Sequence, residues 1–118
     1  MGMILSFALC LVTLVDPQQQ GFCEDPNMTP QMCGDAAFKK ADTELNAVYS
    51  QALKASDSSN RKLLIDAQRK WVAFRDADCK AEFKKWEGGS GAPAAQLYCL
   101  AELTTQRTKT IRERYLNR

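Results

Sequence analysis

The segment Gly88-Gly89-Ser90-Gly91-Ala92-Pro93 interrupts the second half of a chain of 118 residues. No helix can continue through it, because glycine and proline are the strongest breakers of regular structure. On both sides, apolar residues recur at steps of three and four, the spacing of an amphipathic helix, and no run of strand length alternates. The segment therefore predicts a short connection between two helices that run in opposite directions.

The helix before this segment is expected from about Arg61 to Trp86, and its apolar residues form two adjacent stripes. One stripe consists of Leu64, Ala67, Trp71 and Phe74, and the other of Ile65, Val72 and Cys79. Two stripes predict two packing partners. The helix after the segment is expected from about Ala94 to Leu116, with an inner face made of Leu97, Leu100, Thr104, Ile111 and Tyr115.

A further helix is expected to begin at Thr29-Pro30, where threonine caps the helix and proline takes its first position. Its apolar face consists of Phe38, Ala41, Leu45, Val48 and Ala52. It should end near Ser56, because Asp57-Ser58-Ser59-Asn60 favours a turn. The predicted fold class is all-α, an antiparallel three-helix bundle with an irregular N-terminal arm over residues 18–30.

The chain carries five cysteines and no histidine. Ile4 to Val15 is an apolar run that is too short to span a bilayer and has the length of a signal-peptide core. We therefore expect residues 1–20 to be a signal peptide and residues 21–118 a single helical domain. A buried core helix is the alternative for this run. Leu9 directly before Cys10 does not fit a lipoprotein signal, which argues against a lipid anchor.

Removal of the leader leaves four cysteines, which predicts two disulfides in an exported domain. Cys79 and Cys99 both lie ten residues from Gly89, so they should face each other across the hairpin. This bridge is worth roughly 3 kcal/mol in the chain-entropy model. Cys33 would then pair with Cys23, and this second disulfide would attach the N-terminal arm to the bundle. The alternative pairs Cys33 with Cys79 and Cys23 with Cys99, and the wide spacing does not suit a zinc site.

The same hairpin arithmetic suggests which polar residues meet. It places Asp42 level with Arg75, Asn46 level with Trp71, and Trp71 level with Arg107. We expect a polar network around Trp71 that fixes the helix register, and a functional pocket is the alternative. Its members are Asp42, Asn46, Arg75, Asp76 and Arg107.

The charge and the residue types exclude several classes of function. With 16 basic and 14 acidic residues, the net charge of +2 is too small to indicate a nucleic-acid partner. The chain lacks histidine and a glycine-rich phosphate loop, and its carboxylates are spaced as helix caps and surface pairs. We therefore expect no catalytic residue, no metal and no cofactor.

Four segments in order resemble the LprI-type lysozyme-inhibitor family of exported bacterial proteins. They are Cys33 followed by Ala41-Asp42-x-x-Leu45-Asn46-x-x-Tyr49, then Ala67-Gln68-Arg69-x-Trp71-x-x-Phe74-Arg75-Asp76-x-x-Cys79, Gly88-Gly89-Ser90, and Cys99-Leu100-x-x-Leu103-Thr104-x-x-Arg107. The resemblance implies a small disulfide-bonded helical domain in the periplasm, on the cell envelope or secreted, and inhibition of lysozyme. No family motif marks an inhibitory residue.

An inhibitor would act by occlusion, with a rigid protrusion placed in the glycan cleft of the enzyme. The irregular stretch that the predicted disulfide anchors runs from Glu87 to Ala95. Cationic or hydrogen-bonding groups beside it could engage the two carboxylates on which lysozyme depends. The candidate binding residues are Lys84, Lys85, Trp86 and Ser90. The alternative is that these glycines only turn the chain.

Basic residues near the C-terminus oppose the inhibitor hypothesis, because many lysozymes are basic and like charges slow encounter. From Thr104 to the end, Glu113 is accompanied by Arg107, Lys109, Arg112, Arg114 and Arg118. The alternative function is therefore an immunity-type protein of the periplasm or a cell-envelope binding module with another target. A solvated helix face with cations near its C-terminus explains the same residues without a partner.

Overall fold

The computed structural model describes residues 25–117, and all regular structure in this part of the chain is helical. The helices are α2 (Pro30–Ala55), α3 (Ser58–Lys85) and α4 (Ala92–Ile111), followed by the π-helical turn η1 (Arg112–Leu116). The predicted all-α class is confirmed. No helix within these residues is long and apolar enough to cross a membrane.

The helix ends follow from capping side chains. The Thr29 hydroxyl accepts from the Met32 N–H at 3.2 Å, with Pro30 at the start of α2. Asp57 caps α3 by accepting from the Asn60 N–H at 2.8 Å. The predicted start of α2 is therefore confirmed, and α3 begins three residues earlier than predicted because Asp57 caps it.

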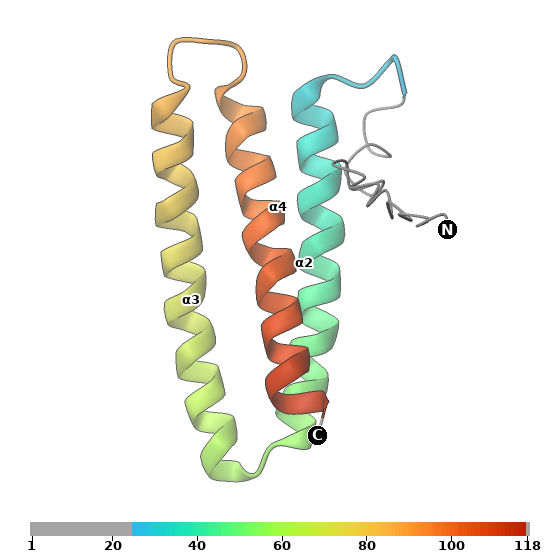
Figure 1. Ribbon diagram of the computed structural model, residues 1–118, viewed down its shortest axis with the longest axis vertical. Helices are drawn as coiled ribbons and strands as arrows, with labels where there is room; N and C mark the ends of the chain where they lie inside the picture. Colours follow the sequence, from blue (N-terminus) through green and yellow to red (C-terminus); the bar gives the residue numbers. More distant parts are fainter. Residues whose placement is uncertain (1–24, 118) are drawn as a thin grey trace, which may run out of the picture.

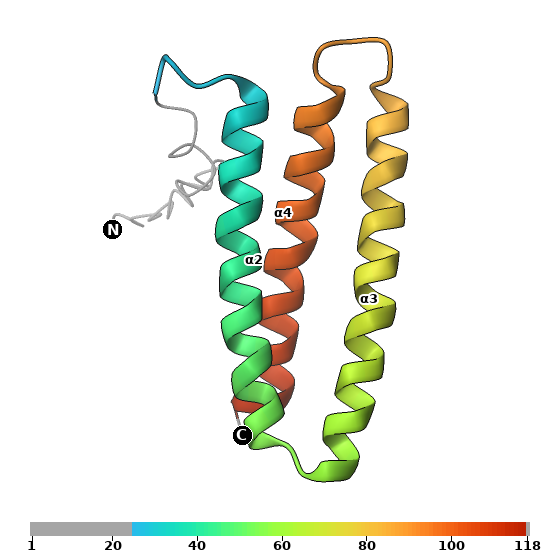
Figure 2. The same cartoon turned by 180° about the vertical axis from the view of Figure 1, so that it is seen from behind.

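Figure 1 shows α3 running in the opposite direction to α2 and α4, and Figure 2 shows α4 between the other two helices from behind as well. α2 packs closely along α4, and α3 packs against α4. The backbones of α2 and α3 hardly approach each other. The helix predicted to have two packing partners therefore approaches α4 along its backbone and meets α2 through side chains alone.

Small residues explain why α4 became the neighbour of α2. A Cβ atom added to Gly34 would lie 2.9 Å from the Leu97 Cβ atom, so the Leu97 side chain packs directly on the backbone of Gly34. Ala41 and Ala52 on α2 are buried, as are Ala94 and Ala101 on α4. Small residues at a contact allow helix axes to lie close together.

The main core lies toward the end of the molecule where α2 joins α3. It is formed by the buried side chains of Leu45, Val48, Ala52, Leu64 and Ile111. Full burial of a leucine or isoleucine contributes about 1.5–3 kcal/mol. On α3 only Leu64, Gln68, Arg75 and Cys79 are buried. Ala67 and Phe74, expected in the inner stripe, are exposed.

The predictions for the N-terminus concern residues outside the described part of the chain. They include the signal peptide, Cys10, most of the arm and Cys23. Cys33 is buried in the first turn of α2. Its pairing with Cys23 stays a prediction, whereas the alternative pairing of Cys33 with Cys79 is wrong, because Cys79 is bonded to Cys99.

Candidate functional site

The connection between α3 and α4 forms one end of the molecule, and we call residues 84–91 the tip (Figure 1). Gly88 adopts a φ of +95°, a backbone conformation that residues with a Cβ atom rarely reach. Gly91 occupies the cap of α4 without a side-chain hydrogen bond, and Pro93 lies in its first turn. The glycines that break the helical pattern in the sequence therefore make the turn.

The tip is fixed to the bundle by a disulfide between Cys79 of α3 and Cys99 of α4. The Cα atoms of the two cysteines are 5.5 Å apart, and Cys79 is fully buried. The predicted pairing across the hairpin is confirmed. Its consequence is that the two helices are joined about one and a half to two turns below the tip.

All four candidate binding residues are exposed on the tip. Trp86 is 55% exposed, and Ser90 lies among the glycines of the turn. The Lys84 ammonium pairs with the Glu87 carboxylate at 2.6 Å. Lys85 instead lines a groove between α3 and α4. The structure therefore gathers these residues at one end of the molecule, but the two lysines do not form one cationic patch.

The groove beside the tip is open and has a volume of about 560 Å³. Its walls carry three carboxylates, those of Asp78, Glu82 and Glu102, and the ring of Tyr98. Lys85 is the cation among its lining residues. The groove therefore offers a mainly acidic surface next to the exposed indole of the tip.

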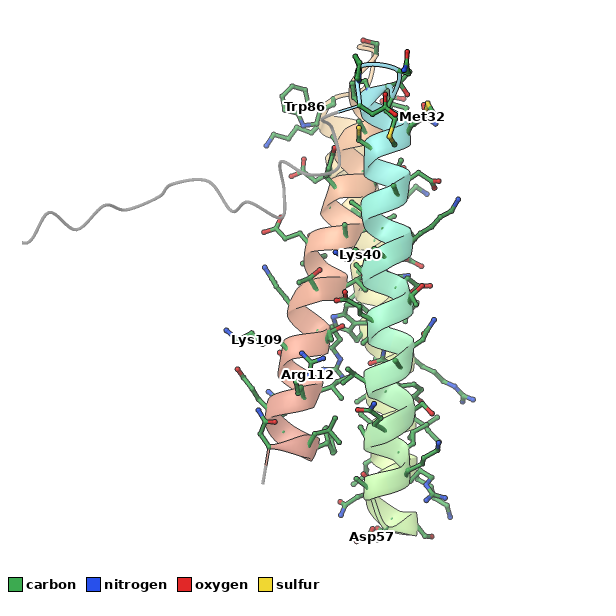
Figure 3. All side chains as sticks on the ribbon, turned by 90° about the vertical axis from the view of Figure 1, so that its right-hand side faces the viewer. Met32, Lys40, Asp57, Trp86, Lys109 and Arg112 are labelled. Carbon is green, nitrogen blue, oxygen red and sulfur yellow. A yellow bond between two sulfur atoms is a disulfide. The ribbon has the colours of Figure 1, made fainter. Side chains whose placement is uncertain are left out.

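Met32 is a surface residue of the same end that the sequence did not reveal. It is 50% exposed, although it lies in the first turn of α2 next to the buried Cys33. Figure 3 shows Met32 and Trp86 at the same end of the molecule. Large apolar side chains that remain exposed in this way are candidates for contact with a partner.

Arg75 lies at the centre of the predicted polar network and is held by α2, α3 and α4. Its guanidinium carbon is 5.2 Å from the ring centre of Phe38 and 5.3 Å from that of Trp71. Nη1 donates to the Thr104 hydroxyl at 3.4 Å. Nε and Nη2 donate to Asp76 Oδ1 at 3.0 and 2.9 Å. Side chains thus bridge the gap between the backbones of α2 and α3.

Arg107 covers Trp71 from α4, with its guanidinium carbon 5.8 Å from the ring centre. Its Nε donates to the Gln68 side-chain oxygen at 3.0 Å. Burial lowers the pKa of Arg107, and the nearby charge of Arg114 lowers it further, while Tyr115 raises it. Gln68 is a member of this network that was not predicted from the sequence.

Asp42 and Asn46 interact with each other on α2, where the Asn46 amide donates to Asp42 at 3.5 Å. No salt bridge within residues 25–117 joins Asp42 to Arg75. Arg75 pairs instead with Asp76, the next residue on its own helix. The structure therefore brings Arg75, Asp76 and Arg107 together around Trp71 and does not link Asp42 to them by an ion pair.

A second open groove lies between α2 and α3, with a volume of about 430 Å³. Tyr49, Leu53, Ile65 and Val72 make most of its walls apolar. The groove exists because the stripe of Ile65 and Val72 does not pack directly onto the α2 backbone. Within the described residues, no group of three or more histidine, cysteine, aspartate or glutamate side chains is placed to hold a metal ion.

Comparison with known proteins gives a family and a relative. A sequence model of the family described as Lysozyme inhibitor LprI matches residues 23–111. An uncharacterized protein of Rhizobium meliloti is 31% identical over 125 residues, which cover 92% of this chain and 90% of that protein. No solved structure matches.

Proposed function

Because the chain belongs to the LprI lysozyme-inhibitor family, we propose that it is a non-enzymatic, exported inhibitor of lysozyme or of a related peptidoglycan-degrading enzyme. The observation that carries the proposal is the match to residues 23–111, which spans α2, α3, α4 and the tip. Inhibition would take place by occlusion, with the tip placed in the cleft of the enzyme and no bond made or broken.

The build of the tip supports this role. A disulfide and two long helices hold it, so it loses little conformational freedom when it binds. Trp86 offers an exposed indole of the kind that anchors protein interfaces. Lys84, Lys85 and Ser90 surround it with polar groups that could reach the carboxylates of a glycan-cleaving enzyme.

The distribution of charge is compatible with a basic enzyme as the partner. Asp78, Glu82 and Glu102 lie in the groove beside the tip. Arg112 and Arg114 lie beyond the last turn of α4, at the opposite end. The 20 residues of α4 separate the two ends by about 30 Å. This exceeds the Debye length of about 8 Å at physiological salt, so repulsion from the basic end is screened.

A cell-envelope binding module or a periplasmic immunity-type protein is the second candidate, and the basic end favours it. Lys109 pairs only loosely with Glu113, at 4.0 Å, and Arg112 is exposed. Figure 3 shows Lys109 of α4 and Arg112 of η1 close together toward the C-terminal end of the molecule. Arg118 lies outside the described residues. Such a surface would suit an anionic wall polymer or an acidic toxin.

The test is the lysis of purified cell walls by a chicken-type lysozyme in the presence of the oxidised protein at equimolar concentration. We expect slower lysis with the wild-type chain. The Trp86→Ala variant should need an at least tenfold higher concentration for the same effect, because loss of an interface anchor commonly costs about 2 kcal/mol or more. A combined Lys84→Ala, Lys85→Ala and Ser90→Ala variant tests the polar part of the tip.

Leu63→Ala is the matched control, because Leu63 is also an exposed apolar residue of α3 and lies at its other end. This variant should inhibit like the wild type. Absence of inhibition across several lysozyme types would overturn the proposal. Binding to anionic wall polymers that is lost with Lys109→Ala and Arg112→Ala would then support the envelope module.

A further inference from the structure

Five exposed residues form a stripe along α3 that is symmetric about Phe74. Ala67 and Ala81 lie seven residues before and after it, and Lys70 and Asp78 lie four residues before and after it. All five are exposed. Phe74 is 57% exposed, which is high for a phenylalanine in the middle of a 28-residue helix. An exposed aromatic ring with small neighbours on the same face makes this stripe a candidate contact surface.

The symmetry of the stripe identifies what covers it. When two copies of one helix pack in opposite directions about a two-fold axis, a residue four positions before the axis faces the residue four positions after it in the other copy. With the axis at Phe74, Lys70 faces the partner's Asp78, and Asp78 faces the partner's Lys70. Ala67 faces the partner's Ala81, and the two Phe74 rings meet on the axis.

We propose that the chain forms a two-fold dimer through α3, with Phe74 at its centre. The alanines allow close approach of the two helices, and the charges select the opposite orientation, since a parallel pair would place Lys70 against the partner's Lys70. The stripe reads alanine, lysine, phenylalanine, aspartate, alanine, so a second copy in the opposite direction offers an aspartate to each lysine and an alanine to each alanine. This match to itself favours a second copy of the chain over an unrelated partner.

The ion pairs within one chain leave Lys70 and Asp78 able to pair with a second copy. Lys70 pairs with Asp66 one turn away at 2.9 Å, and both side chains are mostly exposed, so the pair is weak. Asp78 takes part in none of the salt bridges found within residues 25–117. Each Lys70 can therefore add or exchange an ion pair when the second copy arrives.

The dimer leaves Trp86 and Ser90 of the tip free, although it covers Asp78 and Ala81, which line the groove beside the tip. Because the axis is perpendicular to α3, the two tips point in opposite directions, 12 residues or about 18 Å from Phe74 along each helix. Trp86 is therefore accessible in both copies. The dimer does not depend on the proposed inhibition, and its tests measure association alone.

The first test is sedimentation equilibrium of the oxidised full chain over a wide range of concentrations, together with cross-linking. We expect a monomer–dimer equilibrium. Phe74→Cys should form an intermolecular disulfide under mild oxidation, since residue 74 lies on the axis. Thr43→Cys, an exposed position of α2, is the matched control and should stay unlinked. A monomer at all concentrations would overturn the proposal.

The second test exchanges the charges. Lys70→Asp and Asp78→Lys should each weaken dimerisation about tenfold or more, because each places two like-charge pairs at the interface. The double variant restores opposite pairing and should dimerise like the wild type. Circular dichroism confirms that each variant is folded. If the single variants dimerise as strongly as the wild type, or if the double variant does not regain the dimer, the assigned axis is wrong.

Discussion

Arg75 shows how a charged side chain becomes part of the interior. Its side chain is only 11% exposed, yet Asp76, with which it forms an ion pair, is 58% exposed. It also contacts the rings of Phe38 and Trp71 and the hydroxyl of Thr104. An arginine stacks on aromatic rings through its planar guanidinium, which a lysine cannot imitate. We infer that stacking and packing, rather than the exposed ion pair, hold Arg75 in place.

Arg75→Lys should therefore destabilise the protein by about 2 kcal/mol, although it keeps the charge, because it loses the stack and the hydrogen bond to Thr104. Asp76→Ala should cost less than about 1 kcal/mol, since it removes only a half-exposed pair. Urea unfolding of both variants measures the difference. Equal losses in the two variants would show that the ion pair carries the stability.

Gly34→Ala tests the close contact between α2 and α4. An alanine in a helix is usually favoured over glycine by about 1 kcal/mol. Here the new Cβ atom would lie 2.9 Å from the Leu97 Cβ atom, which cannot move without its helix. Overpacking costs about 1–3 kcal/mol, so we expect a net loss of stability. Thermal unfolding measures it, with Gly89→Ala as the control, because a Cβ atom there meets only the Trp86 carbonyl at 3.6 Å.

At the scale of the helices, the Cys79–Cys99 bridge joins α3 to α4 across the tip, with a sequence separation of 20. Replacement of both cysteines by alanine should destabilise the protein by about 3 kcal/mol in the chain-entropy model. The tip would also lose its anchor, so any inhibition of lysozyme should weaken in parallel. Denaturant unfolding of the double variant, compared with the oxidised wild type, checks the first effect. An unchanged midpoint would show that packing alone holds the hairpin.

The sequence predicted the elements that local chemistry determines. Thr29, Asp57 and the glycines of the tip set the helix ends through hydrogen bonds and backbone angles of single residues. The Cys79–Cys99 pairing followed from equal distances to Gly89, because a tight turn fixes the register of the two helices that it joins. The contact of Arg107 with Trp71 follows from that same register.

Which helix packs directly on α2 could not be predicted from the sequence, because α3 and α4 compete for that position. The hairpin rule placed α2 beside α3 and Asp42 beside Arg75. The small surface around Gly34 lets α4 approach α2 more closely than α3 can. Phe74 shows a limit of pattern-based prediction, because a residue with core periodicity stays exposed when neither neighbouring helix covers its face of α3.

For the whole molecule, the uneven packing predicts uneven stability. α2 and α4 each bury six residues and pack closely on each other, whereas the longer α3 buries four. Two of those four, Gln68 and Arg75, are polar and depend on partners from other helices. A segment with few buried apolar contacts opens at a lower free energy than the rest of the fold.

Amide hydrogen exchange followed by mass spectrometry should therefore find the middle of α3 less protected than α2 and α4. Reduction of the Cys79–Cys99 bridge should widen this difference, because Leu64 is then the main apolar anchor of α3. Measurements at rising protein concentration separate this effect from association, since a dimer through α3 would protect the residues around Phe74 selectively. Equal protection of the three helices at low concentration would contradict the prediction and indicate that the side-chain bridge through Arg75 makes the three helices unfold as one unit.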